Sequence, residues 1–134
     1  MLGREIGHEI GQQTSMRVMP DAKHGMMMEV SVHGEGTMLG MHVDDHTTYH
    51  SWQEPDGSIR GRGQGILMGE GGEAATWEGQ GVGTRRDDGS IHYRGAMFYR
   101  AQTPRMATLN GACCVFEYDV DAGGKSEGRF FLWE

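Results

Sequence analysis

The sequence predicts an all-β protein, folded as an antiparallel up-and-down barrel of about eight strands. Short runs of alternating polar and apolar residues recur along the chain, as in half-buried strands. Turn signals such as Pro55-Asp56-Gly57 and Asp87-Asp88-Gly89 separate these runs at the spacing typical of hairpins. Glycine is abundant, with 23 residues in 134, and it often alternates with other residues inside predicted strands, which suits a tightly coiled sheet.

The length of 134 residues is that of one domain. The segment 1–13 is ambiguous. Ile6 and Ile10 are four residues apart, as on one face of a helix, whereas glycine at every fourth position weakens such a helix. We interpret this segment as a flexible arm or an added strand. Residues 14–134 then form a single β-barrel domain.

The first half of the barrel domain carries four predicted strand segments. Alternate residues such as Met28 and Val30 face one side of the second segment. Gly34-Glu35-Gly36 is interpreted as a bend, and Asp44-Asp45 as a turn or a bulge. The predicted segments are Ser15–Met19, Met26–His33, Thr37–Val43 and Thr47–Gln53.

The second half contains the most regular pattern, a meander of three strands joined by short loops. Glycine occupies every second position in parts of its first two strands. Ala101–Gly111 is the longest irregular connection. The predicted strands are Ser58–Met68, Ala74–Arg85, Ser90–Arg100, Ala112–Val120 and Arg129–Trp133.

The loops of the meander predict its register. If three residues loop out at Pro55–Gly57 and at Asp87–Gly89, the strands on either side are aligned by counting outward. A two-residue turn at Asp88-Gly89 would shift the last pairing by one. Aromatic side chains often shield glycines on the neighbouring strand. The predicted register places Tyr49 opposite Gly63, Trp77 opposite Gly65 and Tyr93 opposite Gly83.

The same register sorts the meander into two faces. One face carries the glycines together with Trp77, Tyr93, Met97 and Tyr99, and we place it inside because it is the more apolar. Two alternatives remain: the polar face lines the interior, or the glycine face packs against another subunit. The polar face carries Arg62, Gln64, Glu78, Gln80, His92 and Arg94.

Charge and composition argue against several classes of function. The net charge of −7 disfavours binding to nucleic acid phosphates or to anionic membranes. No apolar run approaches the roughly 20 residues of a membrane-spanning helix, and the N-terminus lacks the pattern of a signal peptide. Cys113 and Cys114 are the only cysteines, and adjacent cysteines rarely bridge each other. Free thiols predict a reducing, cytoplasmic setting.

Several motifs resemble those of a group of small uncharacterised bacterial and archaeal proteins. They are the glycine-rich runs 57–65 and 73–83, Tyr93-Arg94-Gly95, Leu109-Asn110-Gly111 and Phe116-Glu117-Tyr118. In strand number and glycine pattern, the architecture is similar to eight-stranded barrels of the calycin and allene oxide cyclase type. That resemblance implies a small apolar ligand in a central cavity, in some cases with its cyclisation or isomerisation. It carries over no catalytic residue.

The main functional hypothesis is a barrel that binds a small hydrophobic or amphipathic molecule. Its enzymatic version is a metal-free cyclase, isomerase or lyase in which Tyr or Glu side chains polarise the substrate. Glu29 and Glu117 become acid–base candidates if they point into a cavity. We expect no cofactor. The predicted cavity residues are Tyr49, Trp77, Tyr93, Met97, Tyr99, Met41 and Phe116.

Two other functions stay open. A completely filled core would leave a non-catalytic barrel that acts through a protein partner or as a homo-oligomer, a dimer or a trimer. A metal-dependent enzyme would use His42, His46 and His50. Residues four apart in a strand are separated by about 13 Å, so a shared metal site requires a turn at Asp44-Asp45.

Overall fold

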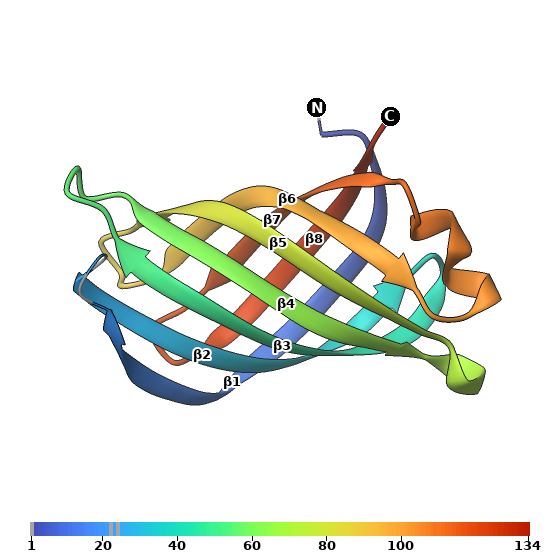
Figure 1. Ribbon diagram of the computed structural model, residues 1–134, viewed down its shortest axis with the longest axis horizontal. Coiled ribbons are helices and arrows are strands. Elements are labelled where there is room, and N and C mark those ends of the chain that lie inside the picture. The colour runs from blue at the N-terminus through green and yellow to red at the C-terminus, as the bar shows by residue number, and fades with distance from the viewer. Residues whose placement is uncertain (1, 22, 24) are drawn as a thin grey trace.

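The structure is a computed structural model that describes residues 2–21, 23 and 25–134. These residues form a closed barrel of eight antiparallel strands in up-and-down order, which confirms the predicted fold class (Figure 1). The strands are β1 (Arg4–Asp21), β2 (Gly25–Met38), β3 (Met41–Gln53), β4 (Ile59–Gly69), β5 (Ala74–Arg85), β6 (Ile91–Ala101), β7 (Cys113–Val120) and β8 (Lys125–Trp133).

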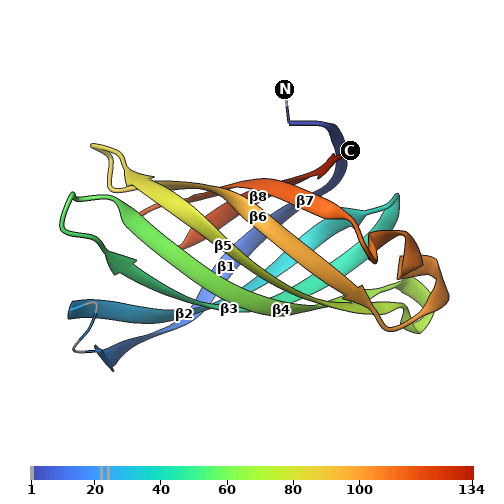
Figure 2. The ribbon, with the colours of Figure 1, turned by 45° about the horizontal axis from the view of Figure 1, so that its top comes forward.

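The barrel closes because β1 pairs with β2 along one edge and with β8 along the other. The two ends of the chain therefore lie side by side (Figure 2). Two 3-10 helices, η1 (Glu70–Gly72) and η2 (Pro104–Leu109), connect β4 to β5 and β6 to β7. Among the described residues, no helix has the length and hydropathy needed to cross a membrane.

The segment 1–13, expected to be an arm or an added strand, contributes the first half of β1. It pairs with two neighbouring strands, as an integral barrel strand does. The spacing of Ile6 and Ile10 suggested a helix, but Ile6 is buried and Ile10 is exposed. The register of β1 against β8 shifts just after Glu5, so that Ile6 and Gly7 are both buried before regular alternation resumes.

The turn between β2 and β3 lies at Leu39-Gly40, and the bend predicted at Gly34-Glu35-Gly36 is wrong. Both turn residues have left-handed backbones, with φ of 53° and 78°, as tight hairpin turns require. A Cβ atom on Gly36 would overlap the carbonyl oxygen of His8 on β1. Glycine there permits close approach of two strands rather than a change of direction. Asp44-Asp45 lies within β3 and makes no turn either.

The predicted register of the meander is confirmed at every pair. The Glu54 and Arg86 amides donate to the Ser58 and Ser90 carbonyl oxygens, each at 2.8 Å, so both loops contain three residues. The ladders align Tyr49 with Gly63, Trp77 with Gly65 and Tyr93 with Gly83. The Trp77 ring occupies the space where a Cβ of Gly65 would lie, and the Tyr93 ring does so at Gly83. Tyr49 shields Gly63 with its Cβ and backbone instead of its ring.

The glycine and aromatic face is inside the barrel, as predicted, and the core lies at its two ends. The larger cluster includes Met38, Val43 and Leu67, and η2 covers it with Met106 and Leu109. The smaller cluster contains Ile59, Tyr93 and Val120, close to the hairpin loops at the opposite end. Between these two clusters the interior is lined by glycines, which leave it open.

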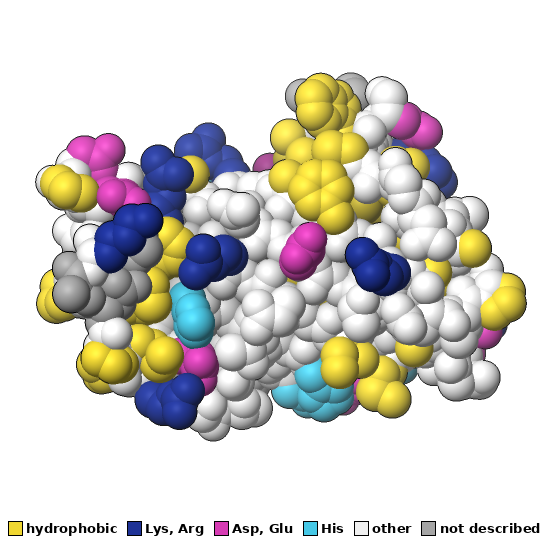
Figure 3. Space-filling model, in the orientation of Figure 1, with side chains coloured by type: hydrophobic (Ala, Val, Ile, Leu, Met, Phe, Trp, Pro, Cys, Tyr) yellow, Lys and Arg dark blue, Asp and Glu magenta, His cyan; other side chains and the backbone are white. Residues whose placement is uncertain are grey.

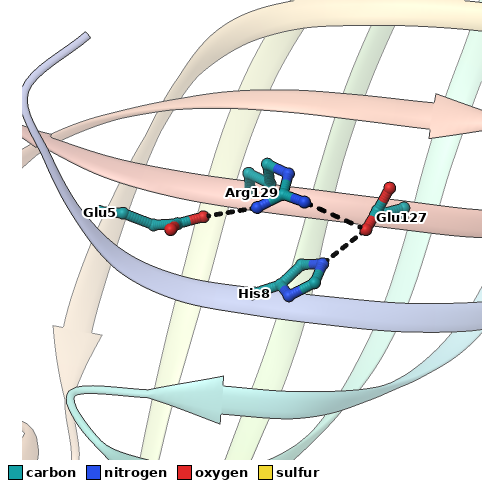
Figure 4. A network of polar contacts seen from close by, with 4 residues as sticks. All are labelled: Glu5, His8, Glu127 and Arg129. Carbon is teal, nitrogen blue, oxygen red and sulfur yellow. Dashed lines mark hydrogen bonds and ion pairs between the residues drawn. The ribbon is translucent and has the colours of Figure 1, made fainter.

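The outer surface carries scattered charges of both signs among uncharged side chains (Figure 3). Ion pairs cross the seam between β1 and β8: Arg129 reaches Glu5 at 3.1 Å, and His8 reaches Glu127 at 2.6 Å (Figure 4). Arg129 also reaches Glu127 on its own strand at 3.5 Å. Exposed pairs of this kind contribute roughly 0–1 kcal/mol each. The seam is therefore held mainly by its backbone ladder.

Candidate ligand-binding cavity

A cavity of about 90 Å³ lies inside the barrel between the two core clusters. Seven of the described glycines line it, from β1, β2, β4, β5 and β8, so much of its wall is backbone. Its apolar side chains include Phe116, Phe130 and Val32. A volume of this size holds several waters or one small organic molecule.

Five of the seven predicted cavity residues line this space: Tyr49, Trp77, Tyr93, Met97 and Phe116. Met41 and Tyr99 do not. Both are buried in the larger core cluster, which also contains Met106 and Leu109 of η2. The irregular connection after β6 folds over that end of the barrel and fills it.

Two acidic side chains, Glu9 on β1 and Asp45 on β3, meet inside the barrel and line the cavity. They are only 7% and 2% exposed. Asp45 Oδ1 accepts hydrogen bonds from Trp77 Nε1 at 2.9 Å and from the Thr47 hydroxyl at 3.3 Å. Gly34 on the intervening strand β2 makes the meeting possible, because a Cβ there would lie 2.9 Å from Glu9 Oε1.

The pKa values of both carboxyl groups are raised inside the barrel. Burial, followed by the neighbouring charge of Asp45, raises the pKa of Glu9 to about 9. Burial also raises the pKa of Asp45, but hydrogen bonds from Trp77 and Glu9 oppose that shift. Glu9 is therefore protonated at neutral pH and donates its proton to Asp45. Because the Glu9 proton is donated to Asp45, Glu9 Oε2 is the atom of the pair that can accept a hydrogen bond from a bound molecule.

Three tyrosines, Tyr49, Tyr93 and Tyr118, form an aromatic cluster on the same cavity, with ring centroids 6.1 to 6.3 Å apart. The Tyr93 hydroxyl is hydrogen-bonded to the Ser51 hydroxyl at 2.9 Å. The buried Tyr118 hydroxyl makes no hydrogen bond of good geometry, although Ser126 lies close enough to lower its pKa, and the buried Glu9 Oε2 has no partner. Burial raises the pKa of Tyr118 to about 12, so its hydroxyl remains a donor at neutral pH.

Sequence reasoning missed the acidic pair for local reasons. Asp45 is in phase with Met41 and Val43 on β3, so alternation alone would have placed it inside. The double aspartate was interpreted as a turn, which broke that alternation. Glu9 lies in the segment whose secondary structure was ambiguous. Glycines at positions 7 and 11, in phase with Glu9, were the available signal.

The other acid–base and metal candidates face outward. Glu29 pairs with Arg17 at 3.0 Å and with His50 at 3.0 Å on the outer surface. Glu117 alternates with inward-facing Phe116 and is not among the cavity-lining residues.

The histidines His42, His46 and His50 lie along the outer face of a continuous strand, so they do not converge. His46 stacks on His33, and the His42 backbone amide donates to Glu70.

No protein-family model matches this chain, and no curated protein matches it. Its fold is similar to that of several solved structures. A protein of unknown function from Clostridium acetobutylicum superposes with a TM-score of 0.83 at 11% identity, covering 98% of each chain. A conserved protein of unknown function from Rhodopseudomonas palustris gives 0.81 at 11% identity, covering 96% of this chain and 95% of that one. A β-barrel-like protein from Acinetobacter baumannii gives 0.79 at 9% identity, covering 97% and 96%.

These similarities support the expected likeness to uncharacterised barrel proteins. They do not confirm the finer likeness to calycin or allene oxide cyclase barrels. At such low identity they show the fold alone.

Proposed function

We propose that this barrel binds a small, uncharged, amphipathic molecule in its interior cavity. The observation that carries the proposal is the presence of two unpaired polar atoms, Glu9 Oε2 and the Tyr118 hydroxyl, on the wall of one cavity. Buried polar groups in proteins are nearly always hydrogen-bonded, and leaving one unpaired costs about 1–3 kcal/mol. A bound polar group supplies the missing partner.

The cavity wall favours a particular ligand chemistry. Trp77, Tyr93, Phe116 and Met97 provide apolar contact for the body of the molecule. The Tyr118 hydroxyl can donate to a carbonyl or hydroxyl group at the polar end of the molecule, and Glu9 Oε2 can accept from a hydroxyl group. The carboxylate of Asp45 lies next to Glu9, so an anionic ligand would meet a like charge in a place of low dielectric. We therefore expect uncharged ligands to bind better than their acidic counterparts.

Binding can be measured with cyclopentanone as the probe and cyclopentane as its apolar match. Methyl NMR of methionine-labelled protein should show a saturable shift of the Met97 signal with cyclopentanone, and a weaker effect with cyclopentane. Met16 is exposed on β1 and serves as the internal control. Absence of a saturable Met97 shift with both probes would favour the alternative of a non-catalytic barrel.

Two tyrosine variants separate ligand contact from structural damage. Tyr118→Phe removes an unpaired hydroxyl, so we expect unchanged or slightly higher stability together with three- to tenfold weaker cyclopentanone binding, on the order of one hydrogen bond. Tyr93→Phe breaks the bond to Ser51 and should lower the free energy of unfolding by about 1 kcal/mol. Equal binding by Tyr118→Phe and wild type would contradict the proposed polar contact.

The paired carboxyl groups support a second candidate, an acid–base enzyme of the isomerase or lyase kind. A protonated and an ionised carboxyl side by side can give a proton to a carbonyl oxygen and accept one from the adjacent carbon. The test is deuterium incorporation next to the carbonyl of cyclopentanone in D2O. Wild-type protein should accelerate it, and Asp45→Asn should not. Binding without acceleration would retain the first function and exclude this one for cyclopentanone.

A further inference from the structure

We propose that the outer face of β2 and β3 binds a divalent transition-metal ion through His33, Glu35 and Asp44. This site lies outside the barrel and is independent of the interior cavity. Its three side chains each offer one ligand atom, and these atoms all lie within 4.8 Å of one another. The closest two, His33 Nε2 and Asp44 Oδ1, are 2.9 Å apart.

The strand register explains why these residues meet. Glu35 lies directly opposite Asp44, and His33 lies directly opposite His46, so two residues of each strand form a block on the outer face. Ligand atoms around one zinc ion lie about 2.0–2.2 Å from it, which places them about 3–4 Å from each other. Small side-chain rotations that move the ligand atoms by about 1 Å would bring all three donors to that spacing.

Charge gives an independent reason for a cation here. Like charges directly opposite on paired strands are destabilising. Glu35 and Asp44 form such a pair, and among the described residues no Lys or Arg makes an ion pair with either of them. A bound cation would remove this repulsion.

The other histidine–carboxylate pairs on the described surface differ from the pair of His33 and Asp44. Each of them has an arginine on the same carboxylate. Arg17 contacts Glu29 of the His50 pair at 3.0 Å, Arg86 contacts Asp119 of the His92 pair at 3.0 Å, and Arg129 contacts Glu127 of the His8 pair at 3.5 Å.

At the pair of His33 and Asp44 the third member is a second carboxylate, Glu35, in place of an arginine. A positive charge is present at three of these sites and missing from the fourth. The metal ion takes the place of that charge.

The donor set indicates the class of metal. One imidazole and two carboxylates suit first-row divalent ions such as Zn²⁺ or Mn²⁺ better than Mg²⁺, which prefers oxygen ligands alone. His46 stacks on the His33 ring with centroids 4.9 Å apart and an angle of 19°, which orients the imidazole. Three protein ligands leave coordination positions for water. A groove along the outer face begins beside His33 and His46 and gives access to them.

The direct test is calorimetric titration of the full-length protein with ZnCl2. Wild-type protein should bind one Zn²⁺ at this site, and His33→Ala should weaken that binding at least tenfold. His92→Ala is the matched control, because it removes a histidine from a pair that already has its arginine. Equal loss in both variants, or no loss in His33→Ala, would overturn the proposal.

A second measurement needs no variant. Mn²⁺ added at substoichiometric amounts should selectively broaden the backbone amide NMR signals of residues 33–35 and 44–46. Broadening centred elsewhere would overturn the proposed location. Mg²⁺ at the same concentration should not compete with Mn²⁺, and full competition would identify a carboxylate-only site and also contradict the role of His33.

Discussion

At the scale of single residues, the interior of this barrel depends on which way each side chain points. Tyr93 and Trp77 could be placed inside because they lie opposite glycines on the more apolar face of the meander. Asp45 could not, because a charged residue is an improbable core residue unless its partner is known. That partner, Glu9, is 36 positions away and reaches it across Gly34. Pairs of this kind arise only from the closed barrel, so local pattern does not reveal them.

The raised pKa of Glu9 leads to a prediction about the pH dependence of stability. The pKa of Glu9 is raised to about 9, so between the usual glutamate range and pH 9 the native state holds one proton more than the unfolded chain. The unfolding free energy should therefore fall as pH rises through this window, by up to about 1.4 kcal/mol per pH unit. Glu9→Gln should remove most of that slope in urea titrations from pH 5 to pH 9.

The control for this experiment is Glu117→Gln, which changes a glutamate on β7 outside the cavity. It should keep the wild-type slope. A wild-type protein with flat stability over the same range would show that Glu9 is ionised in the folded state.

At the scale of elements, hairpin loops made the second half of the barrel predictable. Loop length determines register, and each of the two loops that precede β4 and β6 ends in the turn signal Asp-Gly. The first half lacked such loops. Its real turn uses Leu39, a residue that rarely adopts positive φ, while Gly34 and Gly36 resembled a turn but serve close strand packing.

The shielded glycines of the meander can be tested by adding a methyl group. Gly65→Ala places a Cβ inside the Trp77 ring, and a rigid ring bonded to Asp45 cannot move freely. We expect a loss of about 1–3 kcal/mol in the free energy of unfolding. Gly123→Ala is the matched control in a loop, where the nearest atom, Asp121 Oδ1, is 3.4 Å away. Its effect in urea denaturation should stay within about 0.5 kcal/mol, and equal losses in both variants would contradict the shielding role.

At the scale of the whole molecule, closure turns a linear series of hairpins into an enclosed space. The ladder between β1 and β8 joins residues at opposite ends of the chain, from Arg4 opposite Leu132 to Gln12 opposite Lys125. Without it, Glu9 would lie on an open sheet edge and the cavity would have no wall there. The candidate site therefore depends on the segment whose structure the sequence left most ambiguous.

The adjacency of the chain ends predicts that their order in the sequence can be changed. A circular permutant that joins residue 134 to residue 2 through a short Gly-Ser linker, with new ends between Asp56 and Gly57, keeps every strand intact. It should fold cooperatively, with a circular dichroism spectrum like that of wild type, and it should retain the Met97 response to cyclopentanone.

The contrasting permutant opens the chain between Gly34 and Glu35, where the sequence suggested a bend. That cut falls inside β2, between the two strands that carry Glu9 and Asp45, so we expect it to prevent cooperative folding. Equal folding of both permutants would show that β2 is not needed as a continuous strand, and that closure of the barrel tolerates a break beside its acidic pair.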